Sequence, residues 1–285
     1  MDQTDDRLIR IIKSGSYPLR PIPTNIKPIY KKLDSIRAVL FDIYGTMLIS
    51  SSGDIGMMET GKKDKIERLL KRFKIREDAE KIQNGFIEMV KATHSELKKR
   101  GVDHPEVRYE EMWRIVLPIQ DTEELKEFTL RFEMIINPVY TMPFLRETLD
   151  YFYNMEILLG TISNGQFFTP LYFPALLDHT LYQLGFDREL IYLSFEYGHA
   201  KPSKHMYLRA KETLRKKNID PKEVLYVGND MINDIIPAKE SGFKTALFAG
   251  DKRSLRIHKN DRRVKGIEPD IILTELIQLK NCIGV

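Results

Sequence analysis

The chain has 285 residues, of which 42% are apolar and 30% charged, and its formal net charge is +4. These fractions are ordinary for a globular protein, and the length allows one large or two smaller domains. The basic residues are spread along the chain, which argues against a nucleic-acid-binding face. No apolar stretch approaches the ~20 residues of a membrane helix, and the single cysteine, Cys282, excludes an internal disulfide. We therefore expect a cytoplasmic protein that binds neither nucleic acid nor membrane.

Residues 1–35 are expected to form an N-terminal extension that packs on the core. The apolar residues between Leu8 and Ile12 indicate a short helix, and the prolines between Pro18 and Pro28 interrupt regular structure after it. Residues 29–33 are expected to form a last turn before the first strand.

A short apolar run over residues 38–41 predicts a fully buried strand, and Asp42 follows it directly. Gly45 then provides a backbone that can turn, and Thr46 can cap or bind. Ligands in open α/β sheets lie beyond the carboxyl ends of the strands, so Asp42 stands in the position of a nucleophile. The alternative is that Asp42 only belongs to the turn that ends the strand.

Residues 51–141 are expected to form a separate helical domain inserted after this strand. Beyond a polar linker that ends at Gly61, apolar residues recur at helical spacing from Ile66 to Ile135. Gly101 and Pro105 mark a break between helices. Residues 36–50 and 142–285 are left to form the core.

The second half of the chain alternates between strand and helix patterns. Strands are expected at residues 157–159, 190–194, 224–227, 245–248 and 270–273, and helices at 170–184, 203–217 and 235–240. This alternation predicts an α/β fold whose core is a doubly wound, Rossmann-like parallel sheet.

Five polar residues follow, or lie close after, the carboxyl ends of these strands: Asp42, Ser163, Lys201, Asp230 and Asp234. Right-handed crossovers bring such strand ends to one edge of the sheet. Singly, each later residue has a structural explanation. Ser163 could cap a turn, Lys201 could be an exposed lysine, and the two late aspartates could be helix N-terminal acids. Their order along the chain favours one common site.

This set of motifs resembles that of the haloacid dehalogenase-like (HAD) hydrolase superfamily, over residues 37–48 and about 142–250. The matching motifs are Asp42-x-x-Gly45-Thr46, Ser163-Asn164, Lys201-Pro202 and the acidic run from Gly228 to Asp234. The resemblance implies that the helical insert is a cap domain and that Asp42 is a nucleophile that forms an aspartyl ester. It also implies a catalytic contribution from Lys201 and from residue 44.

The resemblance implies binding roles as well. The residues expected to hold the anionic oxygens of a small substrate are Thr46, Ser163, Asn164 and Lys201, and the expected Mg²⁺ ligands are Asp42, the Tyr44 carbonyl, Asp230 and Asp234. A divalent cation and a lysine would offset the repulsion between a carboxylate and a phosphate dianion. Mg²⁺ prefers such oxygen ligands.

Two positions depart from the usual pattern of phosphatases in this superfamily. Tyr44 stands where a second aspartate protonates the leaving group and later activates water. A tyrosine with a pKa near 10 is a poor proton donor at neutral pH. An Asp-x-Tyr-Gly-Thr motif is similar to that of the 2-haloacid dehalogenases, whose halide leaves without a proton. Asn229 stands where many members have Asp, and Asp230 is the expected substitute ligand.

The sequence favours a Mg²⁺-dependent phosphatase or phosphotransferase acting on a small phosphorylated metabolite. Two late aspartates near an anionic substrate would repel it unless a cation lay between them. Two alternatives stay open, namely dehalogenation of a 2-haloacid through the same aspartyl ester and a weakly active binding or regulatory module. The candidate substrate contacts in the helical insert are His94, His104, Arg108, Tyr109 and Trp113. For Trp113, helix packing is the preferred role.

Overall fold

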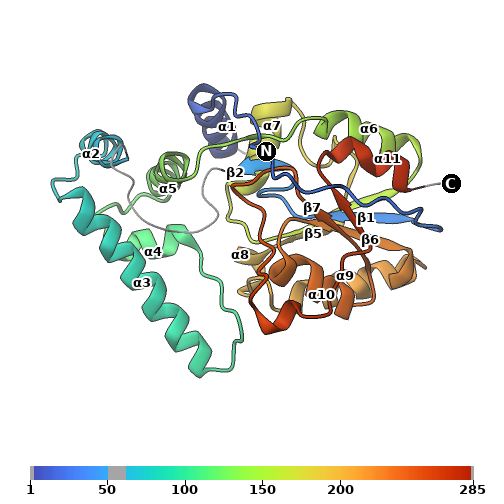
Figure 1. Cartoon of the computed structure of the whole chain (residues 1–285). Coiled ribbons are helices and arrows are strands. Elements are labelled where there is room, and N and C mark those ends of the chain that lie inside the picture. Colours follow the sequence, from blue (N-terminus) through green and yellow to red (C-terminus); the bar gives the residue numbers. More distant parts are fainter. Residues whose placement is uncertain (1–2, 51–61, 284–285) are drawn as a thin grey trace.

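The computed structural model describes residues 3–50 and 62–283 (Figure 1). Its centre is a six-stranded sheet in the order β5-β4-β1-β6-β7-β8, and every neighbouring pair is parallel. The strands are β1 (Ala38–Phe41), β4 (Leu158–Ser163), β5 (Phe186–Leu193), β6 (Val224–Gly228), β7 (Lys244–Phe248) and β8 (Ile271–Leu273). The predicted α/β class with a parallel sheet is confirmed.

The side chains of β1 alternate between two apolar layers, as the pleat of a strand requires. Val39 and Phe41 pack with helices on one face, and Ala38 and Leu40 pack with helices on the other. The helices of the first face are α6 (Leu145–Asn154), α7 (Tyr172–Leu177) and α11 (Leu279–Cys282), and those of the second are α9 (His205–Lys216) and α10 (Ile236–Glu240). Figure 1 shows these two layers above and below the sheet.

Several short elements connect the strands and helices. They are α8 (Ser194–Tyr197), a π-helical turn at Met231–Ile235, and 3₁₀ turns at Thr169–Leu171, Pro221–Glu223, Arg262–Val264 and Leu276–Gln278. Strand β1 is covered on both faces, which explains why it is apolar throughout. Asp42 is the first polar residue after it.

Two sequence expectations about local structure are wrong. The helix expected to reach residue 184 ends at Leu177, because Asp178 adopts a left-handed conformation with φ of 57°. Residues 29–33 form no turn and instead run beside the edge of the sheet. There Ile29 and Ile272 exchange backbone hydrogen bonds of 2.9 and 3.0 Å.

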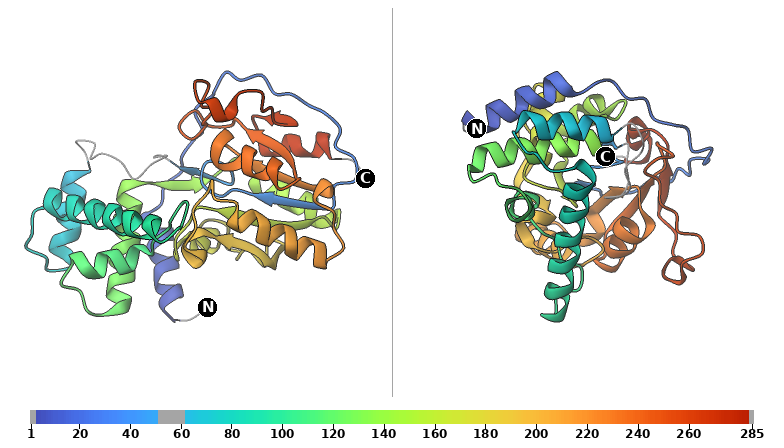
Figure 2. Two further views of the ribbon diagram at one scale, coloured as in Figure 1. Left: turned by 90° about the horizontal axis from the view of Figure 1, so that it is seen from below. Right: turned by 90° about the vertical axis from the view of Figure 1, so that its left-hand side faces the viewer.

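Four helices form a second unit with its own apolar core. They are α2 (Lys63–Arg72), α3 (Ala79–Lys99), α4 (Tyr109–Val116) and α5 (Thr122–Ile136), together called the α2–α5 unit here. Trp113 stacks on Phe86 at a ring distance of 4.1 Å and meets Phe132 edge-on at 4.7 Å. Figure 2 shows the unit standing beside the sheet layers.

A small antiparallel sheet lies where the chain leaves the core and returns to it. It pairs β2 (Leu48–Ser50) with β3 (Val139–Thr141), in a region where the sequence pattern indicated no strand. The expected polar linker falls largely on residues 51–61, outside the described residues.

Helix α1 (Gln3–Gly15) packs against both units. Its buried residues Leu8 and Ile12 belong to the core that includes α7. Near its start, Thr4 Oγ1 donates to Glu123 Oε1 on α5 at 2.7 Å, and Arg7 pairs with Glu127 on the same helix. The extension therefore bridges the sheet layers and the α2–α5 unit.

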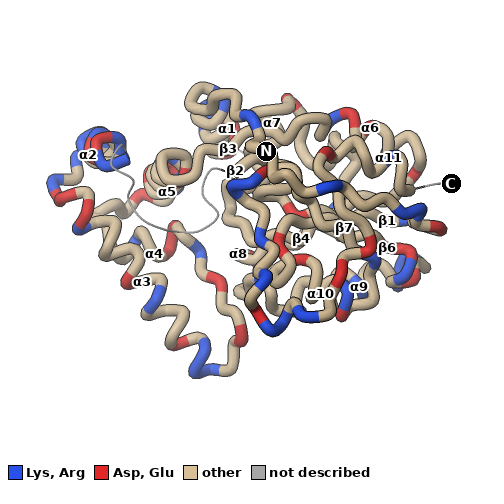
Figure 3. Tube along the Cα trace, viewed as in Figure 1, with Lys and Arg blue, Asp and Glu red and all other residues tan. Residues whose placement is uncertain are grey.

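Lys and Arg are interspersed with Asp and Glu over the described trace (Figure 3). Within residues 3–50 and 62–283, no helix combines the length and apolarity needed to cross a bilayer.

Candidate active site

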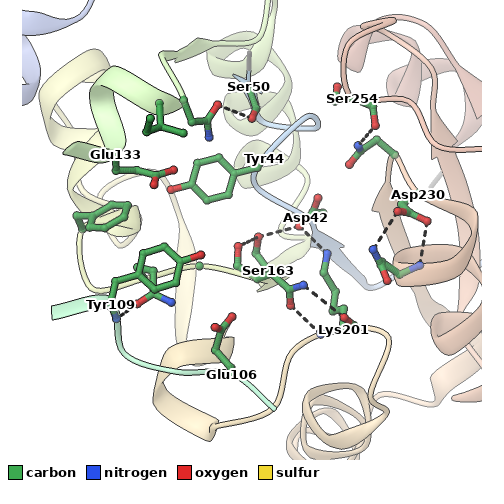
Figure 4. A pocket seen from close by; sticks show the side chains of 18 of the residues that line it. Asp42, Tyr44, Ser50, Glu106, Tyr109, Glu133, Ser163, Lys201, Asp230 and Ser254 are labelled. Carbon is green, nitrogen blue, oxygen red and sulfur yellow. Dashed lines mark hydrogen bonds and ion pairs between the residues drawn. The ribbon is translucent and has the colours of Figure 1, made fainter. Parts of the chain in front are cut away.

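Asp42 lies at the carboxyl end of β1, and its side chain is buried (5% exposed). Its Oδ1 accepts hydrogen bonds from Ser163 Oγ at 2.7 Å and from Lys201 Nζ at 2.6 Å (Figure 4). Ser163 reaches it because β4, the strand that ends at this residue, is a direct neighbour of β1. Oδ2 has no hydrogen-bond partner among the described residues, so this oxygen is available for attack.

Lys201 Nζ lies between two carboxylates. It is 2.6 Å from Asp42 Oδ1 and 2.6 Å from Asp234 Oδ1, and all three side chains are buried. Burial alone would lower the pKa of Lys201, but the charges of Asp234 and Asp42 outweigh it and raise that pKa. The loop is held by Asn164, whose Oδ1 accepts from the Lys201 amide at 2.7 Å. Lys201 is therefore a fixed cation.

Asp234 orients this lysine and closes the loop after β6. Its Oδ1 also accepts from the Tyr226 hydroxyl at 3.1 Å, and its Oδ2 accepts from the amides of Asn229 and Asp230, each at 2.9 Å. A Cβ on Gly228 would lie 2.4 Å from Asp234 Cγ, so only glycine permits this approach. Both carboxylate oxygens are used by the protein itself.

Asp230 is the N-cap of the π-helical turn at Met231–Ile235. Its Oδ1 accepts from the amides of Ile232 at 2.7 Å and Asn233 at 3.0 Å, and it lies 3.0 Å from His258 Nε2. Its Oδ2 accepts from Asn233 Nδ2 at 2.9 Å. Burial, and then the charge of Asp234, raise the pKa of Asp230. The sequence offered a helix N-terminal acid as the alternative, and in the structure Asp230 lies at such a terminus and caps it.

Two of the expected Mg²⁺ ligands, Asp230 and Asp234, are hydrogen-bonded within the protein. The oxygens of Asp230 and Asp234 each accept at least one hydrogen bond from the protein. Asn229 accepts from Thr46 Oγ1 at 3.2 Å and donates to the Ser254 carbonyl at 2.6 Å. In the part of the chain that the structure describes, no group of three or more His, Cys, Asp or Glu could hold a metal ion. As arranged, Asp230 and Asp234 serve the protein's own hydrogen bonds, and of the expected carboxylate ligands Asp42 has an oxygen without a partner among the described residues.

The environment sets the charge of Asp42. Burial raises the pKa of Asp42 to about 6, and the charge of Asp234 acts in the same direction, while Lys201 and Ser163 oppose them. Asp42 is therefore mostly ionised at neutral pH.

Tyr44 stands where the sequence lacks the usual second aspartate, and its surroundings make it a weaker acid than a free tyrosine. Its hydroxyl is 3.0 Å from Thr169 Oγ1, and its ring meets Tyr172 edge-on at 6.5 Å. Burial, and then the charge of Glu133, raise the pKa of Tyr44 far above its ordinary value. It can offer a hydrogen bond, but it is a very weak acid.

The carboxyl end of the sheet opens into a cavity of about 340 Å³, which the sheet layers and the α2–α5 unit line together. Two of the five contacts expected from the helical insert, Tyr109 and Trp113, line this cavity. The other three, His94, His104 and Arg108, are not among its described lining residues. Trp113 also has the packing role that was preferred for it.

The sequence reasoning missed the contribution of α5. Thr129, Phe132, Glu133, Ile136 and Asn137 line the cavity from one face of that helix and its end. The available signal was the pair Thr129 and Glu133, two polar residues four positions apart on an otherwise apolar helix face. Burial raises the pKa of Glu133 to about 7, against a hydrogen bond from Asn137 and the charge of Lys62.

Comparisons with known proteins concern the family and the fold. A family model described as haloacid dehalogenase-like hydrolase matches residues 36–242. A search of curated proteins found no match.

Three similar solved structures illustrate the fold. A 2-haloacid dehalogenase from Pseudomonas syringae has a TM-score of 0.55 at 20% identity, covering 87% of this chain and 97% of that one. A HAD phosphatase from Thermococcus onnurineus has a TM-score of 0.53 at 20% identity, with 86% and 97% covered. An L-2-haloacid dehalogenase from Xanthobacter autotrophicus with chloropropionic acid covalently bound has a TM-score of 0.51 at 18% identity, also with 86% and 97% covered. Such identities support the fold alone. The family model spans most of the sequence, and for that reason the chain belongs to the haloacid dehalogenase-like hydrolases.

Proposed function

We propose that the protein hydrolyses a small organic anion through an aspartyl ester on Asp42 without a divalent cation, as in the dehalogenation of a 2-haloacid. The observation that carries the proposal is Lys201 Nζ, 2.6 Å from both Asp42 and Asp234. The sequence argument for Mg²⁺ was that a second late carboxylate needs a cation beside it. Lys201 is such a cation, so that argument no longer requires a metal. The α2–α5 unit is proposed as the cap.

The first step is a displacement at carbon. Asp42 Oδ2 attacks C2 of the haloacid, the new C–O bond forms, and halide leaves with the electron pair of the C–halogen bond. This leaving group needs no proton, so the weak acidity of Tyr44 is no obstacle. Ser163 and Asn164 remain the proposed contacts of the substrate carboxylate.

The second step is hydrolysis of the ester. Oδ1 becomes the ester carbonyl oxygen, and it already faces Ser163 Oγ and Lys201 Nζ. When water attacks the Asp42 carboxyl carbon, these two donors stabilise the negative charge that develops on Oδ1. The products are the 2-hydroxy acid and the regenerated carboxylate, and one proton passes to solvent.

The test is halide release from 2-bromopropanoate in the presence of EDTA or Mg²⁺. We expect turnover that EDTA does not reduce. In H₂¹⁸O, water attack at the carboxyl carbon should leave ¹⁸O on Asp42, detected as a mass increase of its peptide. Phosphate release that requires Mg²⁺, without halide release, would replace this proposal by the second candidate.

That second candidate is the Mg²⁺-dependent phosphatase favoured by the sequence. One observation supports it: the charge of Asp234 raises the pKa of Asp230, so the two carboxylates repel each other, and a divalent cation would relieve this repulsion. It requires the hydrogen bonds of Asp230 to rearrange. Since Tyr44 is a weak acid, such a phosphatase should prefer aryl over alkyl phosphates. Turnover of neither class would favour the weakly active binding module.

A further inference from the structure

The two ends of the cavity differ in their basic residues. From the sheet layers, Lys201, Arg256 and His258 line it together with the carboxylates of Asp42, Asp230 and Asp234. From the described part of the α2–α5 unit, no Lys, Arg or His lines it, and the charged groups there are carboxylates. Figure 4 shows Glu133 on the cap side with its carboxyl group directed into the cavity, beside the ring of Tyr44.

Of the two cap-side carboxylates, Glu106 is committed to local structure. Its Oε1 accepts from the Val107 amide at 2.9 Å, and its Oε2 accepts from Ser194 Oγ at 2.7 Å. Glu133 has a hydrogen bond with the Asn137 side chain. A carboxylate can accept about four hydrogen bonds, so Glu133 keeps acceptor capacity toward the cavity.

Apolar and aromatic groups line the same side of the cavity as Glu133. Phe86, Trp113, Phe132 and Ile136 form the cavity wall from α3, α4 and α5. In such a weakly polar setting a charged hydrogen bond is stronger than in water. Aromatic faces also attract an ammonium group.

We propose that Glu133 forms a subsite for the distal end of the substrate, and that this end carries a hydrogen-bond donor, ammonium or hydroxyl, on a short apolar chain. The inference rests on the proposed function, because it takes Asp42 as the residue that reacts with the other end of the substrate. A second anionic group at the distal end would face the Glu133 carboxylate and be repelled. The subsite therefore selects against dicarboxylates and bisphosphates.

The test uses substrate pairs with the same reactive head and chain length that end in either ammonium or methyl. One pair is 6-amino-2-bromohexanoate and 2-bromoheptanoate, and shorter homologues cover other chain lengths. The kcat/KM ratio of each pair is measured at about pH 8 in the wild type, in Glu133→Gln and in the control Glu124→Gln. Glu124 lies exposed on the same helix, away from the cavity lining.

The wild type and Glu124→Gln should prefer the ammonium substrate. Glu133→Gln should lower that preference at least about tenfold, since loss of a charged hydrogen bond is worth about 1.4 kcal/mol or more. The methyl substrate should react nearly as well as before. A ratio in Glu133→Gln that equals the wild-type ratio would overturn the subsite. If that variant also lost activity equally on both substrates, Glu133 would act in the chemistry itself and not in distal binding.

The outcome is separable from the fate of the proposed reaction. Alkyl phosphates with the same ammonium and methyl ends are assayed with Mg²⁺. If the protein is a phosphatase, their kcat/KM ratio still tests the subsite. If neither head reacts, the ligand-induced rise in Tm is compared for each pair in the wild type and Glu133→Gln. Equal rises for the ammonium and methyl ligands in the wild type would refute the subsite whatever the chemistry.

Discussion

At the scale of single residues, Asp42 carries the proposed chemistry through Oδ2. Asp42→Asn removes the attacking carboxylate while keeping the shape of the side chain and an oxygen that can face Ser163. We expect turnover to fall by at least about 10³-fold. The Tm should change little, and the circular dichroism spectrum should match that of the wild type. A folded variant with undiminished activity would refute the assignment of the nucleophile.

The pKa of Asp42 predicts an acid limb in the activity profile. Only the ionised carboxylate attacks, and burial places its pKa at about 6. The kcat/KM should therefore rise with pH up to about 6 and level off above 7. A profile that is flat between pH 5 and 7 would show that Asp42 is already ionised at the lower end.

Glu133 predicts that the stability of the protein falls as pH rises, whereas the activity is expected to rise. Its pKa in the folded protein is about 7, above the ordinary value of 4.5, so the folded state binds this proton more tightly than the unfolded state does. Glu133 therefore lowers the free energy of unfolding as pH rises from about 4.5 to 7. The Tm of Glu133→Gln should fall less than that of the wild type over this range. Parallel Tm curves would contradict the raised pKa.

Sequence reasoning reached the residues of the sheet, and Tyr109 and Trp113 of the helical unit, but it missed those of α5 for a physical reason. Asp42, Ser163 and Lys201 follow strand ends, and parallel strands share one edge at which these ends converge. Glu133 belongs to another unit. Which face of its helix meets the sheet depends on how two separate cores dock, and no local pattern encodes that.

At the scale of elements, the loop after β6 depends on Asp230 as its cap. Asp230→Ala removes the acceptor of two backbone amides and should cost about 1–2 kcal/mol of unfolding free energy. Asp230→Asn keeps a capping oxygen and should be nearly as stable as the wild type. The measurement is urea unfolding of both variants, with activity assayed with and without Mg²⁺. A higher Mg²⁺ concentration for half-maximal activity in the stable Asn variant than in the wild type would show instead that Asp230 binds the metal.

The boundaries of an element could be predicted where the pattern of side chains determines them. They could not be predicted where backbone pairing determines them. The apolar runs of β1 and β6 were expected at nearly their observed positions. By contrast, β2 and β3 have three residues each, too few to show an alternation. The pairing of Ile29 with Ile272 adds an extended segment to the sheet edge through backbone atoms alone.

At the scale of the whole molecule, α1 joins the sheet layers to the α2–α5 unit. Leu8 is fully buried, and Leu8→Ala should reduce the free energy of unfolding by about 2–5 kcal/mol. It should also increase proteolysis of the α2–α5 unit, because the contacts of α1 with α5 would loosen. The control is Lys13→Ala, which removes an exposed ion pair with Asp178 and should cost at most about 1 kcal/mol. Equal effects of the two variants would show that α1 is not a structural bridge.

Trp113 is the single tryptophan of the chain, and it stacks on Phe86 in the wall of the cavity. The intrinsic emission excited near 295 nm therefore originates at this wall. A ligand that enters the cavity should quench or shift that emission whether or not it reacts. The protein thus carries its own optical probe, with which haloacids, phosphate esters and their amino derivatives can be ranked by binding before any of them is known to be a substrate.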